Sequence, residues 1–124
     1  MKNSLWLIIA VVLVGAVYFR ARADGLAPDV ARQHLKDGAL LVDVRSTGEF
    51  NSQHLTGAVN FPHDQIGELL PPRHPDKNQT LLLYCRSGRR SGIAENRLRE
   101  LGYTNVFNLG SYSQAEKALT RPTK

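Results

Sequence analysis

A lone cysteine followed by three arginines is the feature of this sequence with the clearest chemical meaning. Cys85 is the only cysteine, and Arg86, Arg89 and Arg90 follow it within five residues. A thiol becomes a nucleophile when it loses its proton, and nearby positive charge favours the thiolate. A free cysteine is commonly a small buried hydrophobic residue, but such a residue gains nothing from three adjacent arginines. We therefore interpret Cys85 as a reactive thiol.

The thiol lies where a predicted strand passes into a predicted helix. Residues 80–84 are apolar enough for a buried strand, and apolar side chains recur at helical spacing over residues 93–101. Free backbone N–H groups and the helix dipole at such a junction favour an anion. Gly88 permits backbone angles that other residues resist. The hydroxyls of Ser87 and Ser91 can donate further hydrogen bonds, and Ser91 can also cap the helix.

The remaining pattern predicts an α/β fold in which short strands alternate with helices. Further strands are expected at residues 39–44, 58–60 and 105–107, and further helices from Pro28 to about residue 36, at 47–51, 63–70 and 112–119. The prolines of residues 71–78 predict an exposed loop, and residues 120–124 a frayed tail. Such alternation is typical of a mostly parallel sheet with helices on both faces.

Residues 5–19 form an uncharged apolar run, LWLIIAVVLVGAVYF, between Lys2 and two arginines at positions 20 and 22. One interpretation is a membrane anchor, slightly shorter than the usual span of about 17–25 residues. The alternative is a signal peptide cleaved after Ala23, because residues 21–23 have the A-x-A form. Arginines directly after the run weaken this alternative. We therefore expect residues 1–24 to be an anchor or signal and residues 25–124 to be a soluble domain. The domain would be held at a membrane by one helix, or be periplasmic after cleavage near Ala23.

The net charge of +5 overstates the basic character of the soluble part. Removing the three cations that flank the apolar run from the 16 basic residues leaves 13 against 11 acidic ones, a net charge of about +2. This is too weak to indicate a nucleic-acid partner. A single cysteine also excludes an intramolecular disulfide. We expect the soluble domain to be monomeric.

Two blocks of the sequence resemble the rhodanese domains. Residues 41–50, LVDVRSTGEF, with residues 54–62, HLTGAVNFP, are similar to the DVR…EF…H-I-x-G-A-x-N-x-P signature of that family. Residues 84–91, YCRSGRRS, resemble its active-site loop in the C-R-x-G-x-R-S form of small single-domain members, and residues 102–106, GYTNV, resemble the segment that follows the loop helix. The resemblance covers residues 26–119. It implies one rhodanese-like domain with a mostly parallel central sheet flanked by helices.

The resemblance implies a thiosulfate sulfurtransferase. The Cys85 thiolate would take the outer sulfur of thiosulfate as a persulfide, release sulfite, and pass the sulfur to cyanide or a thiol. The loop would bind the donor anion and stabilise the persulfide, and the expected substrate-binding residues are Arg86, Ser87, Gly88, Arg89, Arg90 and Ser91. Among the arginines we expect Arg90 and Arg86 to contribute most, and Arg89 to face solvent.

Structural support is expected from Asp43, Arg45 and Glu49, because the family places an Arg–Glu pair after this strand. His54 is expected to be a hydrogen-bonding scaffold residue. The other three histidines are scattered, and no two fall at metal-ligand spacing. We therefore predict no metal and no cofactor.

The sequence departs from the family pattern after Leu109. The family often continues with a Gly-Gly pair and a nearby tryptophan, whereas this chain has Gly110, Ser111 and Tyr112 and no tryptophan in this region. The departure leaves open how the chain packs near Ser111 and what forms the rim of the substrate site there.

Two alternatives to sulfur transfer have different requirements. Cysteine phosphatases and arsenate reductases need an arginine at the closing position of C-x5-R, where this chain has Ser91 and carries Arg90 one residue early. The second alternative is a non-catalytic domain that binds a partner or carries a persulfide. Inactive relatives usually lose the cysteine, and this chain retains it. The sequence names neither the physiological donor nor the acceptor.

Overall fold

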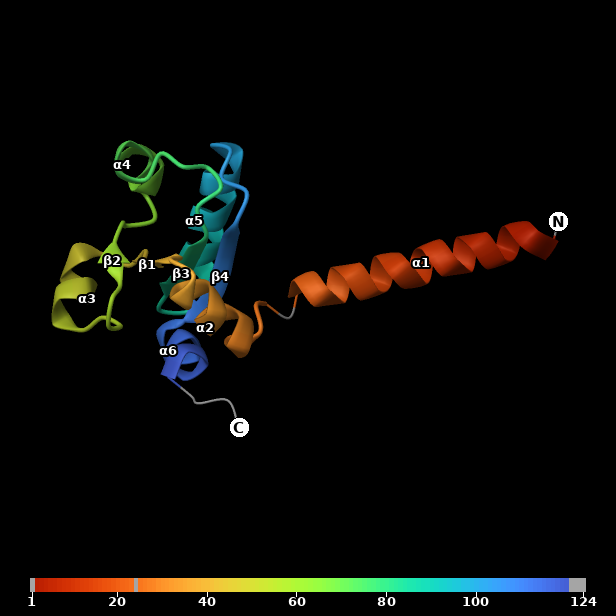
Figure 1. Cartoon of the computed structure of the whole chain (residues 1–124), viewed down its shortest axis with the longest axis horizontal. Helices are drawn as coiled ribbons and strands as arrows, with labels where there is room; N and C mark the ends of the chain where they lie inside the picture. Colours follow the sequence, from red (N-terminus) through yellow and green to blue (C-terminus); the bar gives the residue numbers. More distant parts are fainter. Residues whose placement is uncertain (1, 24, 121–124) are drawn as a thin grey trace.

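Four parallel strands form the centre of the molecule, whose computed structural model describes residues 2–23 and 25–120. β1 (Leu40–Asp43) lies between β2 (Val59–Asn60) and β3 (Leu81–Cys85), and β3 also pairs with β4 (Val106–Ser111). The order is therefore β2-β1-β3-β4 (Figure 1). The predicted α/β class and parallel sheet are confirmed. Because the strands are parallel, their carboxyl ends meet at one edge of the sheet.

Helices connect the strands and cover the sheet, largely as predicted. They are α2 (Pro28–Lys36), α3 (Thr47–Ser52), α4 (Ile66–Arg73), α5 (Arg89–Glu100) and α6 (Tyr112–Thr120), with α1 (Lys2–Ala23) preceding the domain. The turn from β3 into α5 follows the carboxyl end of β3, so it lies at this edge of the sheet. We call residues 85–91 the Cys85 loop.

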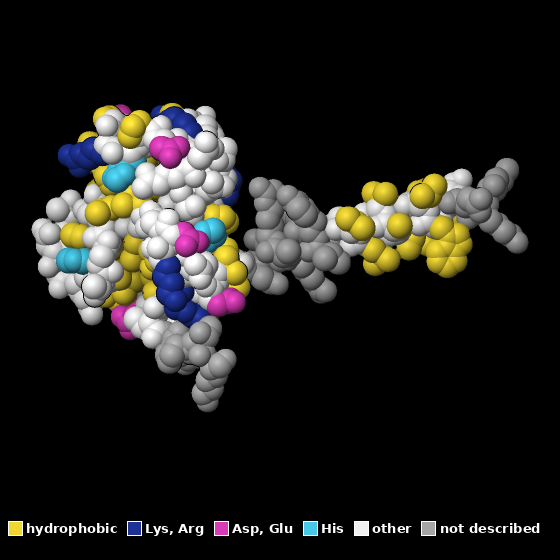
Figure 2. Space-filling view, in the orientation of Figure 1, with side chains coloured by type: hydrophobic (Ala, Val, Ile, Leu, Met, Phe, Trp, Pro, Cys, Tyr) yellow, Lys and Arg dark blue, Asp and Glu magenta, His cyan; other side chains and the backbone are white. Residues whose placement is uncertain are grey.

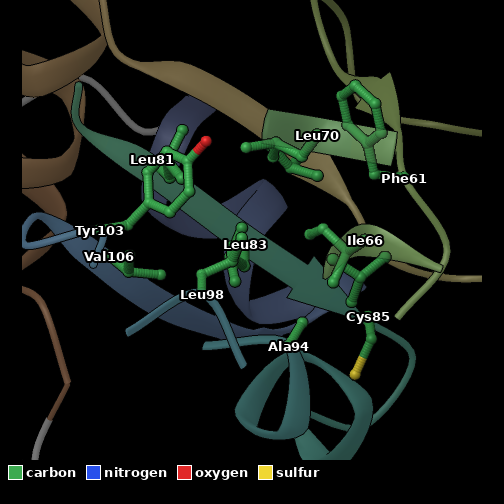
Figure 3. Close-up of a cluster of buried hydrophobic side chains, with 12 residues drawn as sticks. Phe61, Ile66, Leu70, Leu81, Leu83, Cys85, Ala94, Leu98, Tyr103 and Val106 are labelled. Carbon is green, nitrogen blue, oxygen red and sulfur yellow. The ribbon is translucent and has the colours of Figure 1, made fainter. Parts of the chain in front are cut away.

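β3 is buried along its whole length and divides the core in two. Alternate side chains of a strand point to opposite faces. Leu81, Leu83 and Cys85 join the cluster beneath α4 and α5, which Figure 3 shows. Leu82 and Tyr84 join a second cluster with residues of α2 and α6. The parity of β3 therefore places the Cys85 side chain on the face covered by α5, near Ala94 (Figure 3).

Several predicted boundaries were wrong. The segment 71–73 is not a loop, because α4 continues through Pro71 and Pro72 to Arg73. Both prolines lie near the end of the helix, so their missing N–H groups cost only the bonds to residues 67 and 68, and the His74 N–H still donates to the Leu70 carbonyl at 2.8 Å. In addition, α5 begins at Arg89 rather than near residue 93, so Ser91 lies inside this helix and does not cap it. α4 begins at Ile66 rather than at residue 63, and β4 continues to Ser111 instead of ending at residue 107.

α1 projects away from the sheet domain (Figure 1), and apolar side chains surround it (Figure 2). Leu5, Trp6 and Val11 are 63%, 73% and 71% exposed. Within the part of the chain that the structure describes, no helix has both the length and the apolarity needed to cross a membrane. The expected cleavage junction includes residue 24 and the expected frayed tail includes residues 121–124, and these lie outside the described residues.

Candidate active site

The chain turns sharply between Cys85, which ends β3, and Arg89, which begins α5. Gly88 makes this turn possible, because its φ of 89° lies in the left-handed region that side chains resist. A Cβ on Gly88 would also lie 3.3 Å from the Cα of Gly110 on β4. The loop is therefore short and closely packed against β4, and it needs glycine at position 88.

The sulfur of Cys85 is buried and lies within reach of two hydrogen-bond donors from this loop. The Gly88 N–H donates to Sγ at 2.9 Å, and the Ser91 hydroxyl lies 3.4 Å from Sγ. Burial raises the pKa of Cys85, but hydrogen bonds from the Ser91 side chain and from the backbone of Ser91, Ser87 and Gly88 together lower this pKa below its ordinary value. The loop donors therefore favour the thiolate.

The three loop arginines lie in two different environments. Arg86 and Arg89 are exposed, as is Ser87. Within residues 2–23 and 25–120, no side-chain hydrogen bond or ion pair holds either of these two guanidinium groups. Arg90 is half-buried and has a fixed partner. The hydrogen bonds to Sγ come from Gly88 and Ser91 rather than from an arginine.

Arg90 is paired with Glu49 of α3 through two hydrogen bonds. Its Nη1 and Nη2 atoms donate to Oε1 at 2.7 Å and to Oε2 at 3.0 Å. Glu49 also closes a capping box with Ser46, which begins α3. The hydrogen bonds from Arg90 first, and then those from Ser46, lower the pKa of Glu49 to about 2 against the opposing effect of its burial. This pair joins α3 to the start of α5.

Arg45 is paired with Asp43, not with Glu49. The Arg45 Nη2 donates to Oδ2 of Asp43 at 2.6 Å and to the Gln53 carbonyl at 2.6 Å. The guanidinium also lies 5.8 Å from the ring centroid of Tyr84 and 5.0 Å from that of Tyr112. The expected Arg–Glu pair within this segment was therefore wrong, because Arg45 turns inward to Asp43 and the two tyrosine rings while Glu49 pairs with Arg90 of α5.

His54 is a scaffold residue by its contacts. Its Nδ1 lies 2.9 Å from the Phe50 carbonyl, and its ring stacks on that of Phe50 with centroids 3.9 Å apart. No group of three or more His, Cys, Asp or Glu side chains that could hold a metal ion occurs among the described residues.

Ser111 ends β4 and caps the start of α6, which shows how the chain packs where it departs from the family pattern. The Ser111 N–H donates to Oε1 of Gln114 at 2.9 Å, and the Gln114 N–H donates to the Ser111 hydroxyl at 3.1 Å. This reciprocal pair has the S-x-x-Q form of a capping box, so the sequence did carry a signal for it. Tyr112 then packs edge-on against Tyr84, with ring centroids 5.7 Å apart.

Asn108 on β4 also contacts the loop, and sequence reasoning missed it. Its Nδ2 donates to the Gly88 carbonyl at 3.0 Å, and its Oδ1 lies 2.7 Å from the Ser91 hydroxyl. An asparagine within a strand belongs to no sequence pattern that marks a site, and Asn108 lies 17 residues from Ser91 in the chain. Only the pairing of β3 with β4 brings it to the loop.

The comparisons with known proteins agree with this geometry. The family model described as a rhodanese-like domain matches residues 27–118. A thiosulfate sulfurtransferase of Escherichia coli, PspE, is 42% identical over 69 residues, which are 56% of this chain and 66% of that protein. The chain thus spans about half to two thirds of the length of the first curated relatives it matches.

Two solved structures share the fold. A structure described as a rhodanese with anions from E. coli is 38% identical, covers 62% of this chain and 91% of its own, and superposes with a TM-score of 0.59. A human single-domain sulfurtransferase is 26% identical, covers 80% of this chain and 97% of its own, and superposes with a TM-score of 0.62.

Proposed function

Because this chain belongs to the family of rhodanese-like domains, we propose that it is a sulfurtransferase that moves a sulfur atom through a persulfide on Cys85. The observation that carries the proposal is the position of the Cys85 sulfur beneath the Gly88 N–H and the Ser91 hydroxyl. These donors stabilise an anionic sulfur without a metal. A terminal persulfide is also anionic, with its charge one S–S bond beyond Sγ, and we propose that the remaining N–H groups of the turn stabilise it there.

The transfer has two steps. The Cys85 thiolate attacks the outer sulfur of a donor such as thiosulfate, an S–S bond to the cysteine forms, and the S–S bond of the donor breaks. Sulfite leaves with that electron pair. A nucleophilic acceptor, cyanide or a thiolate, then attacks the terminal sulfur of the persulfide and releases the Cys85 thiolate. A covalent intermediate of this kind gives ping-pong kinetics.

The exposed arginines of the loop are the proposed donor-binding groups. Arg86 and Arg89 have guanidinium groups directed to solvent beside the loop, and a planar guanidinium suits the oxygens of a sulfonate-like anion. Arg90 shares its charge with Glu49, so its contribution depends on that pair. Cys85 is 0% exposed, so the donor sulfur has to enter the loop to reach Sγ.

The spacing of the loop argues against phosphate chemistry. The closing position that an arginine would occupy in a phosphatase holds Ser91, which is buried and lies 3.4 Å from Sγ. Arg90 precedes it and turns to Glu49 of α3. If the protein released phosphate from an aryl phosphate and the Cys85→Ser variant did not, the proposal of sulfur transfer would have to give way to phosphatase activity.

Steady-state kinetics with thiosulfate and cyanide test the proposal. Parallel lines in the double-reciprocal plots, and loss of all turnover in Cys85→Ser, are the expected results. Turnover that survives in Cys85→Ser would refute it. A single stoichiometric loading of sulfur with no turnover on cyanide or thiols would instead indicate a persulfide carrier.

We further propose that α1 holds the domain at a membrane. Two observations support this proposal: residues 5–19 are an uncharged apolar run, and the side chains of this run that the structure describes are exposed on α1 (Figure 2). Exposed apolar surface of this extent is a mark of an interaction site. N-terminal sequencing of the protein from membrane and soluble fractions tests this. An intact chain in the membrane fraction is expected, whereas a chain that begins at Asp24 in the soluble fraction would indicate a cleaved signal.

A further inference from the structure

We propose that Asn108 is a positioning residue for Cys85, whose amide fixes the Cys85 loop and gives the Ser91 hydroxyl an acceptor to use when the sulfur is not charged. The inference rests on the proposed function for its catalytic meaning. Its geometry rests on three contacts that converge on one half-buried side chain.

The orientation of the Asn108 amide is determined by two unambiguous partners. The Gly110 N–H can only donate, and it lies 2.8 Å from Oδ1. The Gly88 carbonyl can only accept, and it lies 3.0 Å from Nδ2. The oxygen therefore faces Gly110 and the amide nitrogen faces Gly88. The remaining contact of Oδ1, at 2.7 Å from the Ser91 hydroxyl, must then be a bond that Ser91 donates.

The Ser91 hydroxyl has three acceptors within reach but only one proton. Oδ1 of Asn108 lies 2.7 Å from it, the Gly88 carbonyl 3.1 Å and Sγ of Cys85 3.4 Å. A protonated thiol is a weak acceptor, so the hydroxyl then donates to Asn108. A thiolate attracts a charge-assisted hydrogen bond, so the hydroxyl then rotates toward Sγ. Asn108 remains satisfied in both states, because Gly110 continues to donate to its oxygen.

Asn108 also acts on the second donor to the sulfur. The Gly88 residue whose N–H donates to Sγ at 2.9 Å is held through its own carbonyl by Nδ2 of Asn108. Without this amide the Gly88 carbonyl would keep only the Gly92 N–H and the Ser91 hydroxyl as donors, each at 3.1 Å, so the turn that directs the Gly88 N–H toward Sγ would be held less firmly. Asn108 therefore supports the bond from Gly88 to Sγ and competes with Sγ for the Ser91 proton, although its own atoms do not contact the sulfur among the described hydrogen bonds.

The replacement Asn108→Leu tests this with a readout that needs no turnover. The rate of alkylation of Cys85 by iodoacetamide is followed against pH in the full chain, and its midpoint reports ionisation of the thiol. We expect the midpoint of Asn108→Leu to rise by about one pH unit, because the Gly88 N–H, the closer donor to Sγ, loses its support while the Ser91 hydroxyl keeps the Gly88 carbonyl as a competing acceptor. The control is Asn105→Leu, directly before β4, where the asparagine amide likewise donates to a carbonyl, that of Asn78. Its midpoint should equal that of the wild type. An unchanged midpoint in folded Asn108→Leu would overturn the proposal.

The unmutated protein gives a second test, in case Asn108→Leu does not fold. The amide resonance of Gly110 should titrate with the Cys85 thiol in the wild type, because departure of the Ser91 proton leaves Gly110 as the only donor to Oδ1. In Ser91→Ala this coupled titration should be lost. The proposal would be contradicted if the Gly110 resonance did not shift as the Cys85 thiol ionises in the wild type, or if it shifted to the same extent in Ser91→Ala.

These tests are separable from the proposed function. If thiosulfate fails to load sulfur on Cys85, sulfur transfer is refuted, yet the midpoint of alkylation still reports whether Asn108 positions the thiol. If sulfur is loaded normally and the midpoint is unchanged in Asn108→Leu, only the role of Asn108 is refuted.

Discussion

Two arginine–carboxylate pairs lie beside the carboxyl edge of the sheet and differ sharply in burial. The side chains of Asp43 and Arg45 are 0% and 10% exposed, whereas those of Glu49 and Arg90 are 32% and 25% exposed. The first pair joins residues two apart in the chain, and the second joins residues 41 apart. The same chemistry therefore serves two different purposes in one neighbourhood.

The buried pair, Asp43 and Arg45, supports the fold, whereas the half-exposed pair, Glu49 and Arg90, joins α3 to the start of α5 beside the Cys85 loop. Arg45 links the end of β1 to the Gln53 carbonyl beyond α3, and only 10% of its side chain is exposed. Arg90 lies two residues from Gly88 and 25% of its side chain is exposed, so under the proposed function its pairing with Glu49 would set how much of its charge a donor anion meets. The comparison teaches that proximity to the thiol in sequence does not make an arginine free to bind substrate.

The largest expected effect comes from breaking the buried pair. Asp43→Ala would leave the Arg45 guanidinium buried without its partner, and this should lower the free energy of unfolding by about 3–5 kcal/mol. Urea denaturation measures it. The matched control replaces both residues with leucine, which removes both charges and should recover most of that loss. If the free energy of unfolding of Asp43→Ala fell by less than about 1 kcal/mol, the pair would contribute no more than a surface ion pair does.

Removing the half-exposed arginine should affect donor binding more than stability. In Arg90→Ala we expect the KM for thiosulfate to rise about tenfold, the value of one charge-assisted hydrogen bond, while stability falls by about 1 kcal/mol or less. Alkylation of Cys85 by neutral iodoacetamide should change little, because the bonds to Sγ come from Gly88 and Ser91.

The control for Arg90→Ala is Arg97→Ala, an exposed residue farther along α5. It should leave the KM unchanged. An equal KM in Arg90→Ala and the wild type would mean that the backbone donors and the two exposed arginines bind the anion without Arg90.

A smaller change is expected when only the charge of the partner is removed. Glu49→Gln keeps an oxygen that can accept from Ser46, so the start of α3 is retained, but Arg90 is no longer neutralised. The KM for thiosulfate should fall about twofold, corresponding to about 0.5 kcal/mol for an exposed ion pair. Steady-state kinetics at low ionic strength measure it. A higher KM would show that Glu49 orients Arg90 toward the donor rather than restraining it.

The smallest expected effect is on stability in acid. The pKa of Glu49 falls from 4.5 to about 2 on folding, so its contribution is present above about pH 4.5 and is lost as the pH falls toward 2. Because the side chain is partly exposed, we expect no more than about 0.5 kcal/mol. Between about pH 5 and about pH 3, the urea midpoint should decrease more in the wild type than in Glu49→Gln. Equal losses in the two proteins would mean that the pair adds no stability.

What could be predicted from the sequence was mostly local. The strand before Cys85, the glycine turn and the helix after it follow from neighbouring residues, and so would the capping box of Ser111 and Gln114. The partner of Glu49 could not be predicted in this way, because Arg90 reaches it only after β1 and β3 have paired. Asn108 was missed for the same reason, since the pairing of β3 with β4 brings it to the loop. In α4, composition favoured a loop at Pro71 and Pro72, but the fixed φ of proline also suits a helix, and both residues lie near the end of α4.

The mass of the protein after incubation with thiosulfate tests the central claim most directly. In the wild type, the account predicts the gain of one sulfur atom, located on Cys85 by fragmentation and removed by cyanide. Cys85→Ser should gain none. A wild-type protein that shows no added sulfur, while its Cys85 thiol remains free and titratable, would contradict the claim that this loop carries sulfur.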